Sequence, residues 1–168
     1  MGYDRTYTRE EVNQMLYLSE RRTRPSAGVN GHSGHPISRH TEQREDPFDR
    51  RSIAQDSTFA SRKHLILAVE EALHDPLGQQ ALATMNSNGA ASCSITVQLS
   101  ATLGKIKANV VQSPMTKVGK KNVPTQGPQH FHQNVLVNSV FVLIDRLSAA
   151  EGWAPLHIQT AYPKDFLP

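Results

Sequence analysis

The chain of 168 residues contains one cysteine, Cys93, and this scarcity excludes several classes of small protein. One thiol forms no disulfide within the chain and no zinc cluster built mainly from thiolates. No apolar run approaches the ~18 residues that a helical membrane span requires. The first residues also lack a basic and then apolar leader. We therefore expect a small domain that packing alone holds together.

Acidic residues are absent from a long central stretch. Residues 76–144 contain no Asp or Glu, while the same stretch carries five lysines, Lys105, Lys107, Lys117, Lys120 and Lys121. A band of one charge attracts polyanions and speeds their encounter, which makes nucleic acid the natural partner. Five lysines alone are more typical of a solvated, loop-rich surface, so charge by itself does not identify nucleic acid as the partner.

Helical patterns come first along the chain. Residues 8–21 begin with a capping threonine and two acids and carry a weak apolar stripe. Ser57-Thr58 is expected to open a second helix, in which apolar residues recur at helical spacing on one face: Leu65, Ala68, Val69 and Ala72. Asp75-Pro76 should end it. A third helix should then run to Asn88-Gly89, where glycine permits a left-handed cap.

Strand patterns follow the helices. Residues 93–99 alternate apolar and polar, and 106–111 predict a further strand. Residues 113–129, rich in proline, glycine and lysine, predict a long mobile loop. Residues 135–147 predict one long central strand, with 153–162 as its hairpin partner. Together these patterns predict an α+β domain, with N-terminal helices followed by a twisted, mostly antiparallel sheet.

Histidines are the first candidates for chemistry, since imidazole exchanges protons near neutral pH. His35 and His40 lie in one polar segment beside Arg39. His130 and His132 are two apart, so on a strand they would share a face. They supply two metal ligands at most, with no acidic third ligand nearby. We expect no metal and no cofactor.

The terminal strand divides its side chains by strict alternation. Thr160 and Tyr162 should share a face with Ile158, while His157 should lie on the other face. If Thr160 and Tyr162 point into a cleft, His157 therefore points away from it. The alternative is that Tyr162 only packs at a sheet edge.

No glycine-rich phosphate loop, nucleophile elbow or paired-carboxylate arrangement occurs in the sequence. Histidine, arginine, threonine and tyrosine remain, together with the lysines. Cleavage of RNA by its own 2′-hydroxyl uses such groups without a metal. A base removes the 2′ proton, cations and hydrogen-bond donors stabilise the phosphorane, and an acid protonates the departing 5′ oxygen. The composition permits this chemistry.

Three short segments carry a family resemblance: Gly34-His35-Pro36-Ile37-Ser38-Arg39-His40, then Ser57-Thr58-Phe59 opening a helix, and the terminal Thr160-Ala161-Tyr162-Pro163. In order, spacing and placement they resemble the bacterial ribonuclease A-like toxin domain found at the C-terminus of contact-dependent growth inhibition and other polymorphic toxins. The resemblance covers about residues 34–164. It implies a ribonuclease A-like α+β fold without disulfides and a metal-independent endoribonuclease that cleaves RNA, tRNA among its targets.

The resemblance also implies a catalytic set. His40 would be the general base or acid, and Arg51, eleven residues on, would face the phosphate, with Arg50 as the alternative register. Thr160 would orient the phosphate or base, and Tyr162 would donate a hydrogen bond or act as a weak acid. The general acid is otherwise unassigned. Substrate contacts are expected from His35, Arg39, Lys105, Lys107, Lys120 and Lys121.

One departure from the family lies beside His40. Thr41 stands where the family usually has an apolar residue.

The resemblance extends to partners and location. It implies an RNA substrate and a cognate immunity protein, with a monomeric toxin held in a heterodimer by its inhibitor. We expect residues 1–33 to be an arm or delivery segment and residues 34–168 to be the toxin domain. The domain would be exported within a larger toxin and act in the target-cell cytoplasm.

Two other functions stay open. One is a non-catalytic basic module that binds RNA through the lysines. The other is a toxin of similar fold that acts on a nucleotide.

Overall fold

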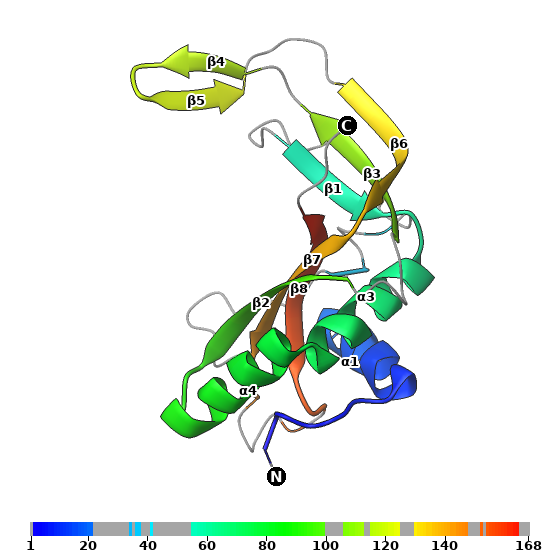
Figure 1. Cartoon of the computed structure of the whole chain (residues 1–168), viewed down its shortest axis with the longest axis vertical. Coiled ribbons are helices and arrows are strands. Elements are labelled where there is room, and N and C mark those ends of the chain that lie inside the picture. The colour runs from blue at the N-terminus through cyan, green and yellow to red at the C-terminus, as the bar shows by residue number, and fades with distance from the viewer. Residues whose placement is uncertain are drawn as a thin grey trace.

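A computed structural model describes residues 2–21, 34, 36–37, 41, 55–99, 106–112, 115–124, 130–147, 152 and 154–164 (Figure 1). Three long helices lie within these ranges: α1 (Arg9–Arg21), α3 (Arg62–His74) and α4 (Pro76–Asn88). The strands are β1 (Gln55–Phe59), β2 (Ser92–Gln98), β3 (Ile106–Gln112), β4 (Met115–Val118), β5 (Lys121–Pro124), β6 (His130–Val137), β7 (Ser139–Asp145) and β8 (His157–Lys164). The predicted α+β class is confirmed.

Helix α1 begins with a reciprocal cap. The Thr8 hydroxyl accepts the Glu11 N–H at 3.2 Å, and the Glu11 carboxylate accepts the Thr8 N–H at 2.8 Å. Its apolar stripe of Val12, Met15 and Leu16 is completely buried. The predicted helix is therefore confirmed. Its residues belong to the same core as the sheet, while the functional boundary between residues 33 and 34 stays a prediction.

The second helix does not begin at Ser57-Thr58, and that prediction is wrong. Both residues lie in β1, where they pair with Val110 and Asn109 of β3. The helix starts at Arg62, because the hydroxyl of Ser61 accepts the N–H of His64 as an N-cap. Hydroxyl-bearing residues thus precede the apolar stripe at two places, Ser57-Thr58 and Ser61. The first pair belongs to a strand, and Ser61 caps the helix.

The predicted apolar face of α3 is confirmed, since its four residues are fully buried. Asp75 ends α3 and also caps α4, whose first residue is Pro76; the Asp75 carboxylate accepts the Leu77 N–H at 2.8 Å. Helix α4 ends at Gly89, which has a left-handed φ of 67°. Both predicted boundaries are correct.

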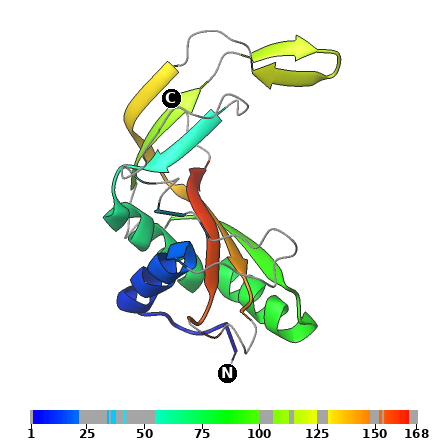
Figure 2. The ribbon, with the colours of Figure 1, turned by 180° about the vertical axis from the view of Figure 1, so that it is seen from behind.

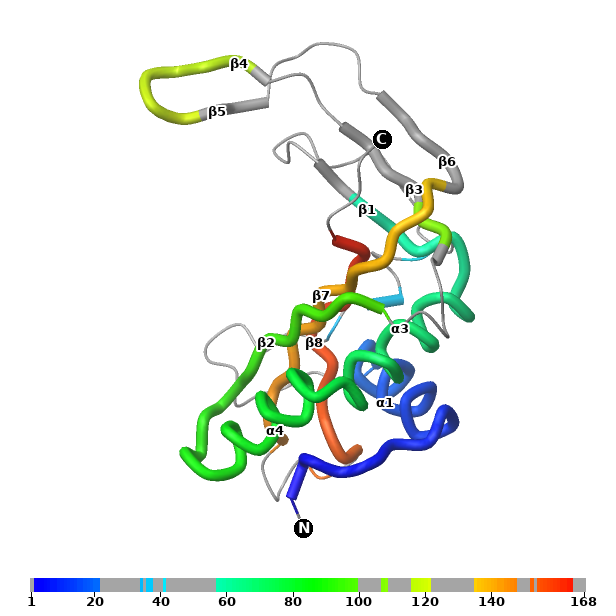
Figure 3. The backbone as a smooth tube through the Cα atoms, viewed as in Figure 1, coloured from blue at the N-terminus to red at the C-terminus, as the bar shows by residue number. Residues whose placement is uncertain are grey.

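Two antiparallel sheets follow, with strand orders β1-β3-β6 and β2-β7-β8. The single long strand predicted over 135–147 is wrong. Asn138 separates β6 from β7, and its carbonyl accepts the Leu99 N–H at 2.6 Å. Strand β6 pairs with β3, whereas β7 pairs with β2 and β8. The chain therefore passes from one sheet to the other at Asn138 (Figure 3).

The loop predicted over 113–129 also needs correction. Residues 115–124 form a two-stranded sheet, the β4–β5 hairpin, in which Val118 pairs with Lys121. Gly119 supplies the positive φ, 62°, at the first of two turn residues. Residues 113–114 and 125–129 lie outside the described residues.

The helices cover one face of the β2-β7-β8 sheet. Val140, Val142 and Ile144 of β7 point toward them and are fully buried. Strand β8 is an edge strand and packs beside α1, as Figure 2 shows from behind. None of the described helices is long and apolar enough to cross a membrane.

Candidate functional site

The terminal strand β8 contains a β-bulge. Thr160 pairs with Leu143 of β7, but Ile158, two residues earlier, pairs with the adjacent Ile144. Gln159 is therefore an extra residue without a partner of its own in the ladder. A bulge of this kind shifts all preceding side chains to the other face of the strand.

The bulge corrects the expected division of the strand. Residues directly opposite in an antiparallel pair share a face. Thr160 and Tyr162 therefore do share the outer face, away from the helices. Ile158, opposite Ile144, lies on the core face, and His157, opposite Asp145, lies on the outer face with the two candidates. The expectation that His157 points away from them is wrong.

A sequence signal for this shift exists in hindsight. Ile158 and Ala161 are both fully buried, yet they are three residues apart. Strict alternation would put them on opposite faces, so two small or apolar residues at this spacing indicate an irregular strand.

The outer face changes from exposed to buried across the sheet. Ser94 and Thr96 on β2 are exposed. Next to them the rings of Phe141 and Tyr162 stack with centroids 4.9 Å apart and planes at 27°. His157 at the far end of β8 is fully buried. Thr160 and Tyr162 on β8 are half-buried, so the face is closed only at the His157 end of that strand.

Thr160 has an unusual hydroxyl. Its Oγ1 is buried and has no hydrogen-bond partner among the described residues. Leaving such a group unsatisfied costs about 1–3 kcal/mol. A buried hydroxyl without a protein partner indicates an ordered water, a bound polar group or local strain.

The start of the first motif lies directly against β8. The Gly34 N–H donates to the Ser19 carbonyl at 2.8 Å, and the Ser19 hydroxyl accepts the Ile158 N–H at 2.9 Å. A Cβ at residue 34 would overlap the Ile158 carbonyl oxygen and lie 3.3 Å from the Gln159 oxygen. Gly34 is therefore required by this close approach to the bulge.

The same motif is anchored at two further positions. Ile37 is buried, and its N–H donates to the carboxylate of Glu20 at the end of α1. Thr41 is 1% exposed, and its hydroxyl donates to the Ile37 carbonyl at 2.7 Å. The Thr41 hydroxyl is thus satisfied locally, which allows a threonine at this buried position.

The second motif also contacts β8. The Ser57 hydroxyl donates to the Pro163 carbonyl at 2.7 Å, and both residues are buried. The two residues are 106 positions apart in the chain. Described residues of all three motif segments therefore meet along this one strand.

Other predicted site residues are only partly placed. His35, Arg39, His40, Arg51, its alternative Arg50 and Lys105 lie outside the described residues. Lys107 is exposed on β3, and Lys120 and Lys121 are exposed in the β4–β5 hairpin. The structure thus unites Thr160 and Tyr162 and places these three lysines on other elements.

A metal centre finds no support within the described ranges, where no group of three or more histidine, cysteine, aspartate or glutamate side chains gathers.

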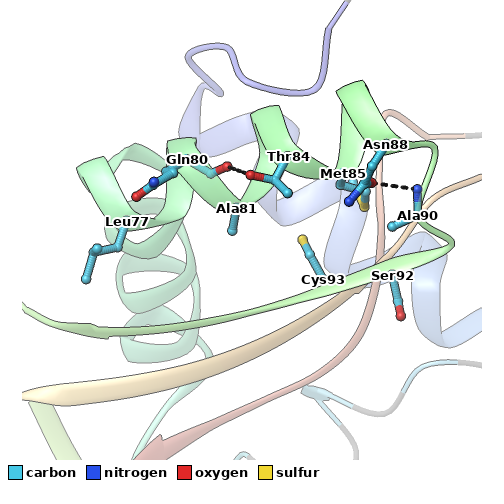
Figure 4. Close-up of a pocket in the computed structure, with 9 residues that line it drawn as sticks. All are labelled: Leu77, Gln80, Ala81, Thr84, Met85, Asn88, Ala90, Ser92 and Cys93. Carbon is cyan, nitrogen blue, oxygen red and sulfur yellow. Dashed lines mark hydrogen bonds between the residues drawn. The ribbon is translucent and has the colours of Figure 1, made fainter.

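A pocket of about 360 Å³ lies elsewhere, between α4 and β2 (Figure 4). It includes Cys93, which pairs with Ile144 and so faces the helices rather than the outer face. Burial raises the pKa of the Cys93 thiol, and a thiol held protonated is a poor nucleophile. This pocket is therefore separate from the face of Thr160 and Tyr162.

No protein-family model, curated protein or solved structure matches this chain.

Proposed function

We propose that this protein is a metal-independent ribonuclease toxin that cleaves RNA of target bacteria by 2′-hydroxyl transesterification. The observation that carries the proposal is the meeting of the three motif segments on β8: Gly34 at the bulge, Ser57 at Pro163, and the terminal motif in the strand itself. Segments that supply one catalytic site must meet in space, and unrelated short matches have no reason to do so.

The reaction needs few groups. His40 removes the 2′ proton, the 2′ oxygen attacks phosphorus, and the 5′ oxygen leaves with a proton as a 2′,3′-cyclic phosphate forms. Arg51, or Arg50, holds the phosphate through its planar fork. Thr160 offers its buried hydroxyl, and Tyr162 offers a phenol held in place by Phe141. Both donors serve the charge that develops on the phosphorane.

His157 has a different place in this scheme. It shares the outer face with Thr160 and Tyr162, yet it is fully buried. It lies farther along the same face, opposite the buried Asp145, so we assign it no contact with the substrate. With His40 as the base, the proton on the departing 5′ oxygen comes from Tyr162 acting as a weak acid; if His40 is instead the acid, the base is unassigned.

The test is cleavage of RNA in EDTA, followed by identification of 2′,3′-cyclic phosphate ends. His40→Ala should lower kcat by about 10²–10⁴, the range for loss of a general acid or base. Tyr162→Phe keeps the ring stack and removes only the phenol oxygen, and Thr160→Val removes only the hydroxyl. Each should lower kcat at least tenfold.

Two matched controls separate catalysis from folding. Tyr17→Phe removes a phenol oxygen from an exposed position on α1, and Thr96→Val removes a hydroxyl from the exposed part of the same sheet face. Both should cleave as the parent protein does. Full activity of His40→Ala, or equal losses in site and control variants, would contradict the proposed mechanism.

A second candidate function is a non-catalytic RNA-binding module. The exposed lysines of the β4–β5 hairpin favour it. It predicts salt-dependent RNA binding with no cleavage at any protein concentration.

The biological part of the proposal concerns export, target and inhibitor. The domain would travel within a larger toxin, act in the target cytoplasm and be held as a heterodimer by its immunity protein. Expression in a bacterium, with and without the neighbouring open reading frame, tests this. Toxicity that the neighbour relieves would support the proposal, whereas harmless expression of a folded protein would refute it.

A further inference from the structure

The β4–β5 hairpin stands away from the rest of the molecule (Figures 1 and 2). Its two strands pair with each other, and no other described element packs substantially against them. An isolated two-stranded ribbon is marginally stable in water, so this hairpin adds little to the core. Its exposed position suits a binding role.

The hairpin itself is positively charged. Lys117, Lys120 and Lys121 are exposed, and residues 115–124 contain no acid. Val118 pairs with Lys121, so Lys121 shares a face with Val118 and lies opposite to the face of Lys117. Lys120 occupies the turn, beside a glycine with open space around it. Positive charge is therefore present on both faces and at the tip.

Lysines on both faces of the hairpin favour a groove over a flat surface as the binding partner. A ribbon that lies flat on a partner needs positive charge on one face only. Charge on both faces suits a groove whose two rims are negative. The wide minor groove of an RNA duplex has phosphates along both rims, and duplex RNA is recognised by shape and backbone contacts rather than by sequence.

We infer that the β4–β5 hairpin binds the groove of a double-helical segment in the RNA substrate, so that the enzyme acts on folded RNA and the hairpin is a binding site apart from the catalytic face. The inference rests on the proposed ribonuclease function. It assigns Lys117, which the family resemblance does not include, and it gives the predicted substrate-binding residues Lys120 and Lys121 a role on duplex RNA.

The test is the triple variant Lys117→Gln/Lys120→Gln/Lys121→Gln, with folding checked by circular dichroism. Binding to a stem-loop RNA should weaken at least tenfold near 0.15 M salt. The slope of log K against log salt should flatten by about 2–3, since each lost phosphate contact contributes about 0.7–0.9. Cleavage of a dinucleotide, which is too short for a duplex, should lose less of its kcat/KM than cleavage of the stem-loop RNA does.

Controls separate position from total charge. Lys63→Gln removes one charge from an exposed position on α3 and should bind the stem-loop as the parent does, whereas Lys120→Gln should not. An unchanged salt slope in the triple variant would overturn the inference. Equal weakening toward a single-stranded RNA of the same length would also overturn it, because a groove would then not be needed.

The outcome also distinguishes this inference from the proposed function. If the parent protein cleaves no RNA but the triple variant loses stem-loop binding, the RNA-binding hairpin stands and the ribonuclease fails. If the parent cleaves RNA and the triple variant instead loses only its binding to the co-expressed neighbouring protein, the hairpin binds that protein and the inference is wrong.

Discussion

Replacing Gly34 by alanine tests the contact on which the proposed site depends. The added methyl group would overlap the Ile158 carbonyl oxygen, a backbone atom at the β8 bulge. Backbone cannot rotate away as a flexible side chain can. We therefore expect the segment that begins at Gly34 to move by about 1 Å away from β8, the shift needed to restore ordinary contact.

The contacts of Gly34 set the expected loss of stability and the expected loss of activity. Overpacking of this kind costs about 1–3 kcal/mol, and the hydrogen bond from the Gly34 N–H to the Ser19 carbonyl is worth about 1 kcal/mol. A loss of about 2–4 kcal/mol from a total of about 5–15 leaves most molecules folded. A displacement of 1 Å in a catalytic group, however, can cost about 10²-fold in rate. Activity should thus fall far more than the folded fraction.

Urea unfolding and RNA cleavage, measured on the same preparation, check this. The matched control is Gly78→Ala, where the methyl group would overlap the Ala72 carbonyl oxygen between α3 and α4. This control should lose similar stability and keep its kcat. Parental kcat in Gly34→Ala, or equal losses of kcat in both variants, would refute the coupling of Gly34 to the site.

Three further predictions concern the scaffold. Deleting residues 1–21 removes three fully buried apolar side chains of α1, each worth about 1.5–3 kcal/mol. Thermal unfolding followed by circular dichroism should therefore lose its cooperative transition. A truncated chain that still melts cooperatively would contradict the packing. The hydrogen bond from Arg5 lowers the pKa of Glu11 from 4.5 to about 2, so its stabilisation is present above pH ~4.5 and is lost as pH falls toward 2. Glu11→Gln should reduce the loss of unfolding free energy between pH 4.5 and pH 2, measured by urea unfolding, by about 0.2–1 kcal/mol, since both side chains are about one third exposed. An unchanged pH dependence would argue against the pair. Burial raises the pKa of the Cys93 thiol, so alkylation at pH 7 should be slower in native protein than in urea. Equal rates would contradict this protection.

Local signals in the sequence are enough to predict most of the helical part. The cap at Thr8, the double cap at Asp75 and the left-handed Gly89 depend on residues within one turn of each boundary. Ser57-Thr58 looks locally like the start of a helix, but these two residues form a strand because they pair with residues about fifty positions away in β3. Pairing partners at that separation leave no local mark.

The sheet shows the same limit. An apolar run over residues 135–147 looks continuous, yet Asn138 divides it between two sheets because the chain changes pairing partners there. The hairpin at 115–124 is obscured by its lysines and prolines, which resemble loop composition. Its register depends on Gly119, whose positive φ allows the two-residue turn.

The candidate site was predictable as a set of residue types and not as a geometry. Thr160 and Tyr162 share a face on either register, because the bulge lies before both of them. Only residues N-terminal to the bulge change sides, and His157 is among them. A single inserted residue thus reverses the expected position of a buried histidine while leaving the two predicted donors in place.

The bulge also explains why the motif segments meet at this strand. In a regular central strand, both edges are occupied by neighbouring strands. Strand β8 is an edge strand, so the Ile158 N–H is free of the ladder and bonds to the Ser19 hydroxyl instead. The Ile158 and Gln159 carbonyls then lie where only a glycine can approach, and that glycine begins the first motif. The bulge, which strict alternation along the strand misses, therefore lies where α1, the first motif and the terminal motif meet.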